Sequence, residues 1–231
     1  MRLKFVFAFF LALAFAPCAA HADDLDKVLR RLDAAAANFH STQAEFQFDS
    51  VVTDPLPDKE TQKGTVYYER HGREFKMAAH IREVNGRPVP KVYVYSGGKI
   101  QLYEKLINQV TVLNKLSQYE SWFMLGFGAS GRELAEKWQI KYLGEETLTE
   151  GSQKFLTDKL EMIAKDPTIR RNIPKVILWI DPQSGVSRKQ VFEEGSGQYR
   201  VSVYFQVKVN QSLPSSAFVL PTDSKTTYTS H

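Results

Sequence analysis

The stretch from Lys91 to Leu113, KVYVYSGGKIQLYEKLINQVTVL, decides the fold class. Apolar residues alternate with polar ones before the Gly97-Gly98 break and on both sides of the Lys105–Asn108 link. Period-two alternation indicates strands with one apolar face, and both links are short enough for hairpin turns. The stretch therefore predicts three antiparallel strands that share an apolar face. On that face we place Val92, Val94, Ile100, Leu102, Val110 and Val112.

The same alternation recurs along most of the chain. It places Phe46 and Phe48 inward in the segment 43–52, Phe75, Met77 and Ile81 inward in 74–82, and Tyr199, Val201, Val203 and Phe205 inward in 198–209. We count about ten or eleven strands, joined by turns, and a loop-like C-terminal tail. The predicted fold is mainly β within the α+β class. One large antiparallel sheet curls into an incomplete β-barrel, lidded by a few α-helices.

Two segments are predicted to supply the helices, at 24–40 and 115–138. The first has apolar residues at spacings of three and four, with Asp23 and Asp24 as candidate N-caps. The second begins with the apolar run 115–127, which includes Tyr119, and continues through a glycine-rich break. Ser130 to Glu133 then fits a capping box that opens a short helix.

The N-terminus has the three parts of a secretory signal peptide. A basic start is followed by the twelve apolar residues Phe5–Ala16 and by the cleavage pattern Ala20-His21-Ala22. Twelve residues are too few for a bilayer span, which needs about 20. Cys18 raises the alternative of a lipoprotein, but Pro17 and Phe15 do not fit a lipobox. We expect cleavage after residue 22, a single domain over 23–231 and a periplasmic location.

Composition argues against several classes of function. The net charge of +4 comes from interspersed charges, so we expect no nucleic-acid partner. Cys18 is the only cysteine, and cleavage after residue 22 removes it, together with any disulfide, thiolate metal site or cysteine nucleophile. The run Gly126–Gly131 matches G-x-G-x-x-G but lacks the βαβ context of a nucleotide site. We predict no enzyme activity, metal or cofactor, and a monomer.

Several stretches in order resemble the periplasmic outer-membrane lipoprotein carrier (LolA-like) family. They are QAEFQFDSVV (43–52), GTVYYERHGREFKM (64–77), YSGGKIQLYEKLINQVTVL (95–113), LWIDPQSGVSRKQVFEEGSGQYRVSVYFQVKVN (178–210) and the closing Phe218–Pro221. The resemblance implies an incomplete barrel with helices over a hydrophobic concavity. It also implies a carrier that takes acylated lipoproteins from an inner-membrane transporter to an outer-membrane acceptor.

The same resemblance implies a set of functional residues. The family's lid-holding arginine aligns with Lys76, which lacks the planar fork of donors. The glycines Gly126, Gly128 and Gly131 are the predicted lid hinge. The predicted lipid-binding residues are Phe46, Phe48, Phe75, Met77, Ile81, Val92, Val94, Ile100, Leu102, Val110, Trp122, Phe123 and Phe127.

Three alternatives remain open from the sequence. The apolar side chains also fit an ordinary core without a ligand. The chain ends TDSKTTYTSH and lacks the family's C-terminal extension, which keeps a carrier or envelope sensor of phospholipid or glycolipid in view. A secreted β-rich hydrolase is disfavoured because no catalytic constellation stands out.

Overall fold

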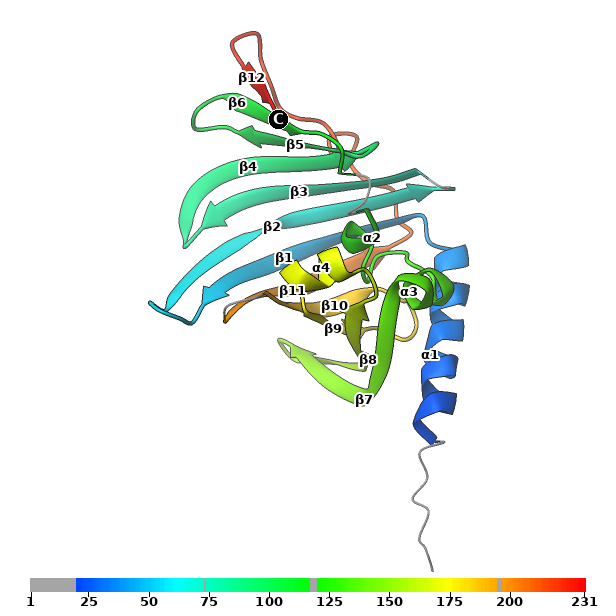
Figure 1. The fold of residues 1–231 in the computed structure, drawn as a ribbon. Helices are drawn as coiled ribbons and strands as arrows, with labels where there is room; N and C mark the ends of the chain where they lie inside the picture. Colours follow the sequence, from blue (N-terminus) through cyan, green and yellow to red (C-terminus); the bar gives the residue numbers. More distant parts are fainter. Residues whose placement is uncertain (1–19, 73, 117–119, 195–196) are drawn as a thin grey trace, which may run out of the picture.

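The computed structural model describes residues 20–72, 74–116, 120–194 and 197–231 (Figure 1). Most of the predicted signal peptide, with Cys18, and Tyr119 of the predicted apolar run lie outside these residues. Within the described ranges, no helix is long and apolar enough to cross a membrane.

In the described part of the chain, twelve strands form one sheet whose two edges do not meet (Figure 1). Neighbours pair antiparallel, except that β12 runs parallel to β6. The predicted incomplete barrel is thereby confirmed. From one edge to the other the strands are β12 (Thr227–Ser230), β6 (Gln109–Leu113), β5 (Lys99–Glu104), β4 (Arg87–Ser96), β3 (Glu74–Val84), β2 (Asp58–His71), β1 (Ser41–Val52), β11 (Gln198–Val209), β10 (Ser187–Glu193), β9 (Lys175–Ile180), β8 (Gln153–Ala164) and β7 (Trp138–Glu150).

The helices lie over one face of this sheet, here called the inner face (Figure 1). They are α1 (Ala20–Ala37), α2 (Glu120–Phe123), α3 (Gly131–Lys137) and α4 (Pro167–Asn172). Helix α1 begins at Ala20, so Asp23 and Asp24 are not its N-cap. The capping box is confirmed, since Ser130 accepts from the Glu133 amide and the Glu133 side chain accepts from the Ser130 amide. Among the described residues of the predicted helical segment 115–138, Glu120–Phe123 and Gly131–Lys137 are helical, and the glycine between them at 126 has a positive φ.

The tail predicted to be loop-like instead covers the outer face and extends the sheet. Phe218 and Leu220 pack on the outer side of β3–β6, and β12 then pairs with β6. His80 Nε2 lies 2.8 Å from the Ala217 carbonyl oxygen, so His80 of β3 contacts the tail. The outward apolar residues on these strands are therefore buried beneath the tail and form part of the core.

Turn length explains why Val92, Val94 and Val110 do not lie on the predicted inner face. The two-residue turn Gly97–Gly98 pairs Tyr95 with Ile100 and Tyr93 with Leu102. A two-residue turn joins odd positions on β4 to even positions on β5, so Ile100 and Leu102 share a face with the tyrosines. The three valines occupy the opposite face, against the tail.

Strand β11 shows a second reversal of the predicted register. Ser202 and Tyr204 face inward beside Phe48 and Phe46, so Val201, Val203 and Phe205 point outward. A shift beside Gln206, whose φ is +48°, restores the inward side for Val207 and Val209. The bulge inverts the alternation once, as an extra residue in one strand must. The period-two alternation therefore predicted the strand correctly but assigned its buried face wrongly.

Candidate functional site

The inner face of β1–β4 and β11 carries a cluster of aromatic side chains that residues 120–137, the covering segment, close off. Phe127 is buried to 1% exposure. Its ring stacks on Tyr68 at 3.8 Å between centroids and meets Tyr204 edge-on at 4.9 Å. Phe123 lies 4.8 Å from Tyr95, which continues the contact toward Phe75. The covering segment thus fills the concavity with its own aromatic rings.

Most predicted lipid-binding residues meet in this inner aromatic cluster. Its buried members include Phe46, Phe75, Ile81 and Phe127, and Phe48, Met77, Ile100 and Phe123 pack partly buried against it. Leu102 lies on the inner face opposite Tyr93 and is half-buried. Trp122 packs instead against the second inner cluster, formed by α1, α3 and β8–β9. Val92, Val94 and Val110 are on the outer face, so the structure does not bring them to the site.

Three carbonyl groups of the covering segment accept hydrogen bonds from the sheet. Gln190 Nε2 donates to Leu125 O at 2.6 Å, and the Ser187 amide donates to Gly126 O at 2.8 Å. Arg70 Nη1 donates to Gly128 O at 2.5 Å. The loop between α2 and α3 is therefore fixed by polar bonds from β10 on one side and from β2 on the other.

The three predicted hinge glycines are places of close backbone approach. Gly126 and Gly128 have φ of +74° and +82°. An added Cβ would lie 2.4 Å from Ser187 Cβ or from Phe39 Cδ1, respectively. At Gly131 it would lie 2.2 Å from the Leu29 carbonyl oxygen. These glycines permit tight packing of the closed arrangement, and their hinge role stays a prediction.

Arg70 at the end of β2 makes the contact that the sequence assigned to Lys76. Besides Gly128 O, its guanidinium reaches Glu133 of α3, with Nη2 at 2.9 Å from Oε1. Lys76 instead lies 3.9 Å from Glu69 and does not reach the covering segment. Arg70 is the first arginine of the quoted stretch 64–77, and no functional role was predicted for it. Its fork-shaped group suits a carbonyl and a carboxylate together.

The electrostatics of this contact favour the ionised carboxylate. Partial burial opposes ionisation of Glu133, but hydrogen bonds from Arg70 and from the Ser130 amide, with the Arg70 charge, hold its pKa below the ordinary value of 4.5. Elsewhere under the covering segment, Tyr95 donates to Glu120 Oε2 at 2.6 Å. Burial and this bond raise the pKa of the Tyr95 hydroxyl. Both groups stay in their bonded forms near neutral pH.

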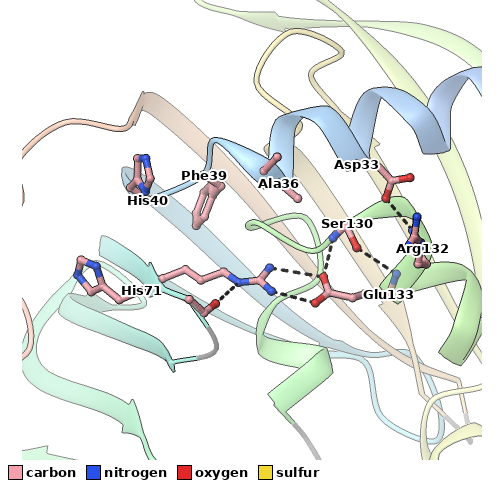
Figure 2. A pocket seen from close by; sticks show the side chains of 11 residues that line it. Asp33, Ala36, Phe39, His40, His71, Ser130, Arg132 and Glu133 are labelled. Carbon is pink, nitrogen blue, oxygen red and sulfur yellow. Dashed lines mark hydrogen bonds and ion pairs between the residues drawn. The ribbon is translucent and has the colours of Figure 1, made fainter.

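A polar cavity of about 650 Å³ lies on the outer side of the Arg70–Glu133 contact (Figure 2). Figure 2 shows Asp33 of α1 beside Arg132 and Ser130 beside Glu133, with His40 and His71 on the facing side. Asp33 Oδ1 accepts from the Arg132 amide at 3.0 Å, which joins α1 to the start of α3. The described residues contain no group of three His, Cys, Asp or Glu placed to hold a metal ion.

Comparisons with known proteins place the fold and leave the function open. No family model and no curated protein matches the sequence. An uncharacterized conserved protein from Thermus thermophilus superposes with a TM-score of 0.53 at 14% identity, over 90% of this chain and 99% of its own. MucB superposes with a TM-score of 0.50 at 13% identity, over 86% of this chain and 63% of its own, so the chain spans less than two thirds of MucB.

A LolA superfamily protein from Nitrosomonas europaea is also among the similar solved structures. Its TM-score is 0.41 at 16% identity, and the match covers 85% of this chain and 97% of that protein. The superpositions on the Thermus protein and on MucB support the predicted fold. At such identities the similarity concerns fold alone, and function must be argued from the site.

Proposed function

We propose that this protein is a periplasmic carrier that holds the acyl chains of lipoproteins against its inner aromatic cluster. It would shuttle them from an inner-membrane releasing transporter to an outer-membrane acceptor. The observation that carries the proposal is the filling of the concavity by the side chains of one short segment. Phe123 and Phe127 of the covering segment occupy the apolar floor, and polar bonds attach that segment to the sheet. Acyl chains offer the floor an equivalent apolar surface once that segment moves away.

Physical chemistry explains why such cargo needs a closed carrier. Each acyl chain released into water would lose on the order of 10 kcal/mol of apolar stabilisation. An empty apolar floor that is exposed to water would also cost free energy, in proportion to its exposed apolar area. A covering segment that fills the floor when cargo is absent removes that penalty. The Arg70 bonds to Gly128 and Glu133 would then set how readily the segment leaves.

Part of the floor extends beyond the covering segment. Phe48, Val84 and Tyr93 pack on the inner cluster but remain half-buried. Arriving acyl chains would meet these side chains first. Phospholipid or glycolipid offers the same acyl chemistry, so a carrier or sensor of these lipids on the same floor is the second candidate.

The first experiment is native mass spectrometry of protein taken from the periplasm without detergent. A mass increase matching an acylated lipoprotein supports the carrier proposal. An increase the size of a phospholipid moves the assignment to the second candidate. A protein that is empty and also ignores added acylated peptide would reject both.

A matched pair of variants locates the binding surface. Phe48 on β1 and Val203 on β11 are half-buried positions on paired strands and face opposite sides of the sheet. Phe48→Lys should abolish uptake of acylated peptide, because it places a charge on the proposed floor. Val203→Lys should leave uptake unchanged. Equal losses in both variants would place the acyl chains elsewhere.

A further inference from the structure

The turn between β5 and β6 exposes two large aliphatic side chains side by side. Leu106 is 71% exposed and Ile107 is 61% exposed. They are the central residues of a tight turn that the Asn108 amide closes by donating to Lys105 O at 3.3 Å. Turns of this kind favour small or polar residues at such positions. The conformation of the turn therefore does not account for Leu106 and Ile107.

Core packing does not account for them either. In the part of the chain that the structure describes, neither residue joins any of the three apolar clusters. The tail packs Phe218 and Leu220 against outward apolar residues on β3–β6, and Leu106 and Ile107 are not among the residues that it covers. The Leu106 and Ile107 side chains thus project from the turn into solvent, while the tail bonds to Asn108 beside them. We refer to Lys105–Asn108 as the β5–β6 tip.

The β5–β6 tip lies at the end of the sheet that also bears the β1–β2 and β3–β4 turns, at the left in Figure 1. Two exposed basic residues stand there, Lys105 in the tip and Arg87 after the β3–β4 turn. Among the described residues, no carboxylate forms an ion pair with either one. The nearby Glu104 is paired with Lys91 at 2.9 Å.

One acidic group also lies close to the tip. Asp223 accepts from Asn108 Nδ2 at 3.0 Å, and Lys225 stands two residues further on. The neighbouring β1–β2 turn exposes Leu56 to 79%, but Asp54 and Asp58 flank it. An anionic surface would repel that turn, whereas the β5–β6 tip combines exposed aliphatic side chains with basic neighbours.

We propose that the β5–β6 tip is a membrane-contact site that seats Leu106 and Ile107 in the interface of an anionic phospholipid bilayer. Protein partners receive apolar anchors in pockets or present them on broad surfaces, whereas a narrow convex tip has little area for a protein to cover. Aliphatic anchors with lysine or arginine beside them are the combination that binds an anionic bilayer interface. The proposal goes beyond the carrier function and does not depend on it.

The test uses sedimentation with phosphatidylcholine vesicles that contain or lack phosphatidylglycerol. The protein is purified from the cell envelope in the form that the cell produces. The tip variant Leu106→Ser/Ile107→Ser should bind the anionic vesicles at least about tenfold more weakly than the wild type. Lys105→Glu should weaken binding several-fold on vesicles with phosphatidylglycerol and have no effect on vesicles without it.

The matched control is Leu156→Ser/Val219→Ser, which removes two aliphatic side chains that are 50% and 57% exposed elsewhere. This control should bind as the wild type does. All variants change exposed positions, and unchanged melting temperatures should confirm that they fold. The proposal is wrong if the wild type ignores the anionic vesicles, if the tip variant binds as well as the wild type, or if the control loses as much.

Uptake of acylated peptide in solution separates this proposal from the carrier function. The tip variant should take up such peptide as the wild type does, because Leu106 and Ile107 lie outside the inner aromatic cluster. Lost vesicle binding with normal uptake supports the contact site. Absent uptake with normal vesicle binding would reject the carrier function and leave the contact site standing.

Discussion

Arg70 and Glu133, 63 positions apart in the sequence, meet at 2.9 Å between Nη2 and Oε1 and join the sheet to the covering segment. The same guanidinium donates to Gly128 O, and the same carboxylate caps α3 through the Ser130 amide. The end of β2, the loop after α2 and the start of α3 therefore share one polar junction. Disturbing it should loosen the aromatic rings that the covering segment places on the floor.

Removing the Arg70 side chain should weaken closure of the covering segment. Arg70→Gln leaves Gly128 O and Glu133 without their donor, which we expect to lower the free energy of unfolding by about 1–3 kcal/mol. Binding of an apolar fluorescent dye should rise, because the inner aromatic cluster becomes accessible. Chemical denaturation and dye titration measure the two effects.

Arg82→Gln is the matched control for Arg70→Gln. Arg82 also pairs with a glutamate, Glu45, but its side chain is 58% exposed on the outer face. An exposed pair contributes about 0–1 kcal/mol, so the control should change stability little and dye binding not at all. Similar changes in stability and dye binding in the two variants would show that Arg70 and Glu133 form an ordinary surface ion pair.

The depressed pKa of Glu133 makes the junction sensitive to acid. A carboxylate whose folded-state pKa lies below its ordinary 4.5 stabilises the fold fully above that value and loses this contribution as the pH falls through the folded-state pKa. Glu133→Gln should therefore be less stable than the wild type at neutral pH, with a difference that shrinks in acid. Denaturation curves across this range measure the difference.

Glu136→Gln on the same helix provides the comparison for Glu133→Gln. Glu136 is exposed, so its loss should change stability little at any pH. A wild-type advantage over Glu133→Gln that stays constant into acid would mean that ionisation of Glu133 does not hold the junction.

The sequence was sufficient for the architecture because period-two alternation depends only on local chain geometry. The capping box at Ser130 and Glu133 was equally local and was found. The face assignments failed where a turn length or a bulge decided them. The two-residue turn at Gly97–Gly98 sent Val92 and Val94 outward, and that turn length was already visible in the sequence. The bulge beside Gln206 left no comparable signal.

The candidate site was predictable in its aromatic residues but not in its polar attachments. Phe46, Phe75 and Phe127 could be placed together because each is apolar and inward in its own element. Arg70 could not be placed, because its partners Gly128 and Glu133 lie far along the chain. Gly126 and Gly128 suggested freedom of motion, whereas their positive φ and near neighbours require glycine for packing.

Gly128→Ala should test that packing requirement. The substitution keeps φ near +82°, which costs an L-residue about 1–2 kcal/mol, and it adds a Cβ 2.4 Å from Phe39 Cδ1. Relief of that overlap should cost about 1–3 kcal/mol more. We expect a lower melting temperature and increased dye binding.

Gly144→Ala carries the same backbone strain without the steric overlap. Gly144 has φ of +93°, and nothing lies within 4 Å of an added Cβ. The difference between the two alanine variants thus isolates the contact with Phe39. Equal losses of stability in both would show that the covering segment accommodates a methyl group at residue 128.

The Tyr204–Gln190–Leu125 chain of hydrogen bonds should behave as a coupled buried unit. Tyr204 donates to Gln190 Oε1 at 3.0 Å, and Gln190 Nε2 donates to Leu125 O at 2.6 Å. Gln190 and Tyr204 are 4% and 6% exposed, so water cannot readily replace a lost partner. Tyr204→Phe and Gln190→Leu should each lower the free energy of unfolding by about 1–3 kcal/mol, because each leaves buried polar groups without a partner.

The double variant Tyr204→Phe/Gln190→Leu distinguishes coupling from two separate defects. It removes both partners of the Tyr204–Gln190 bond, so neither half of that bond is left unpaired. Its loss of stability should therefore fall short of the sum of the single losses by about 0.5–3 kcal/mol, measured by chemical denaturation. Additive losses would mean that the two side chains act independently.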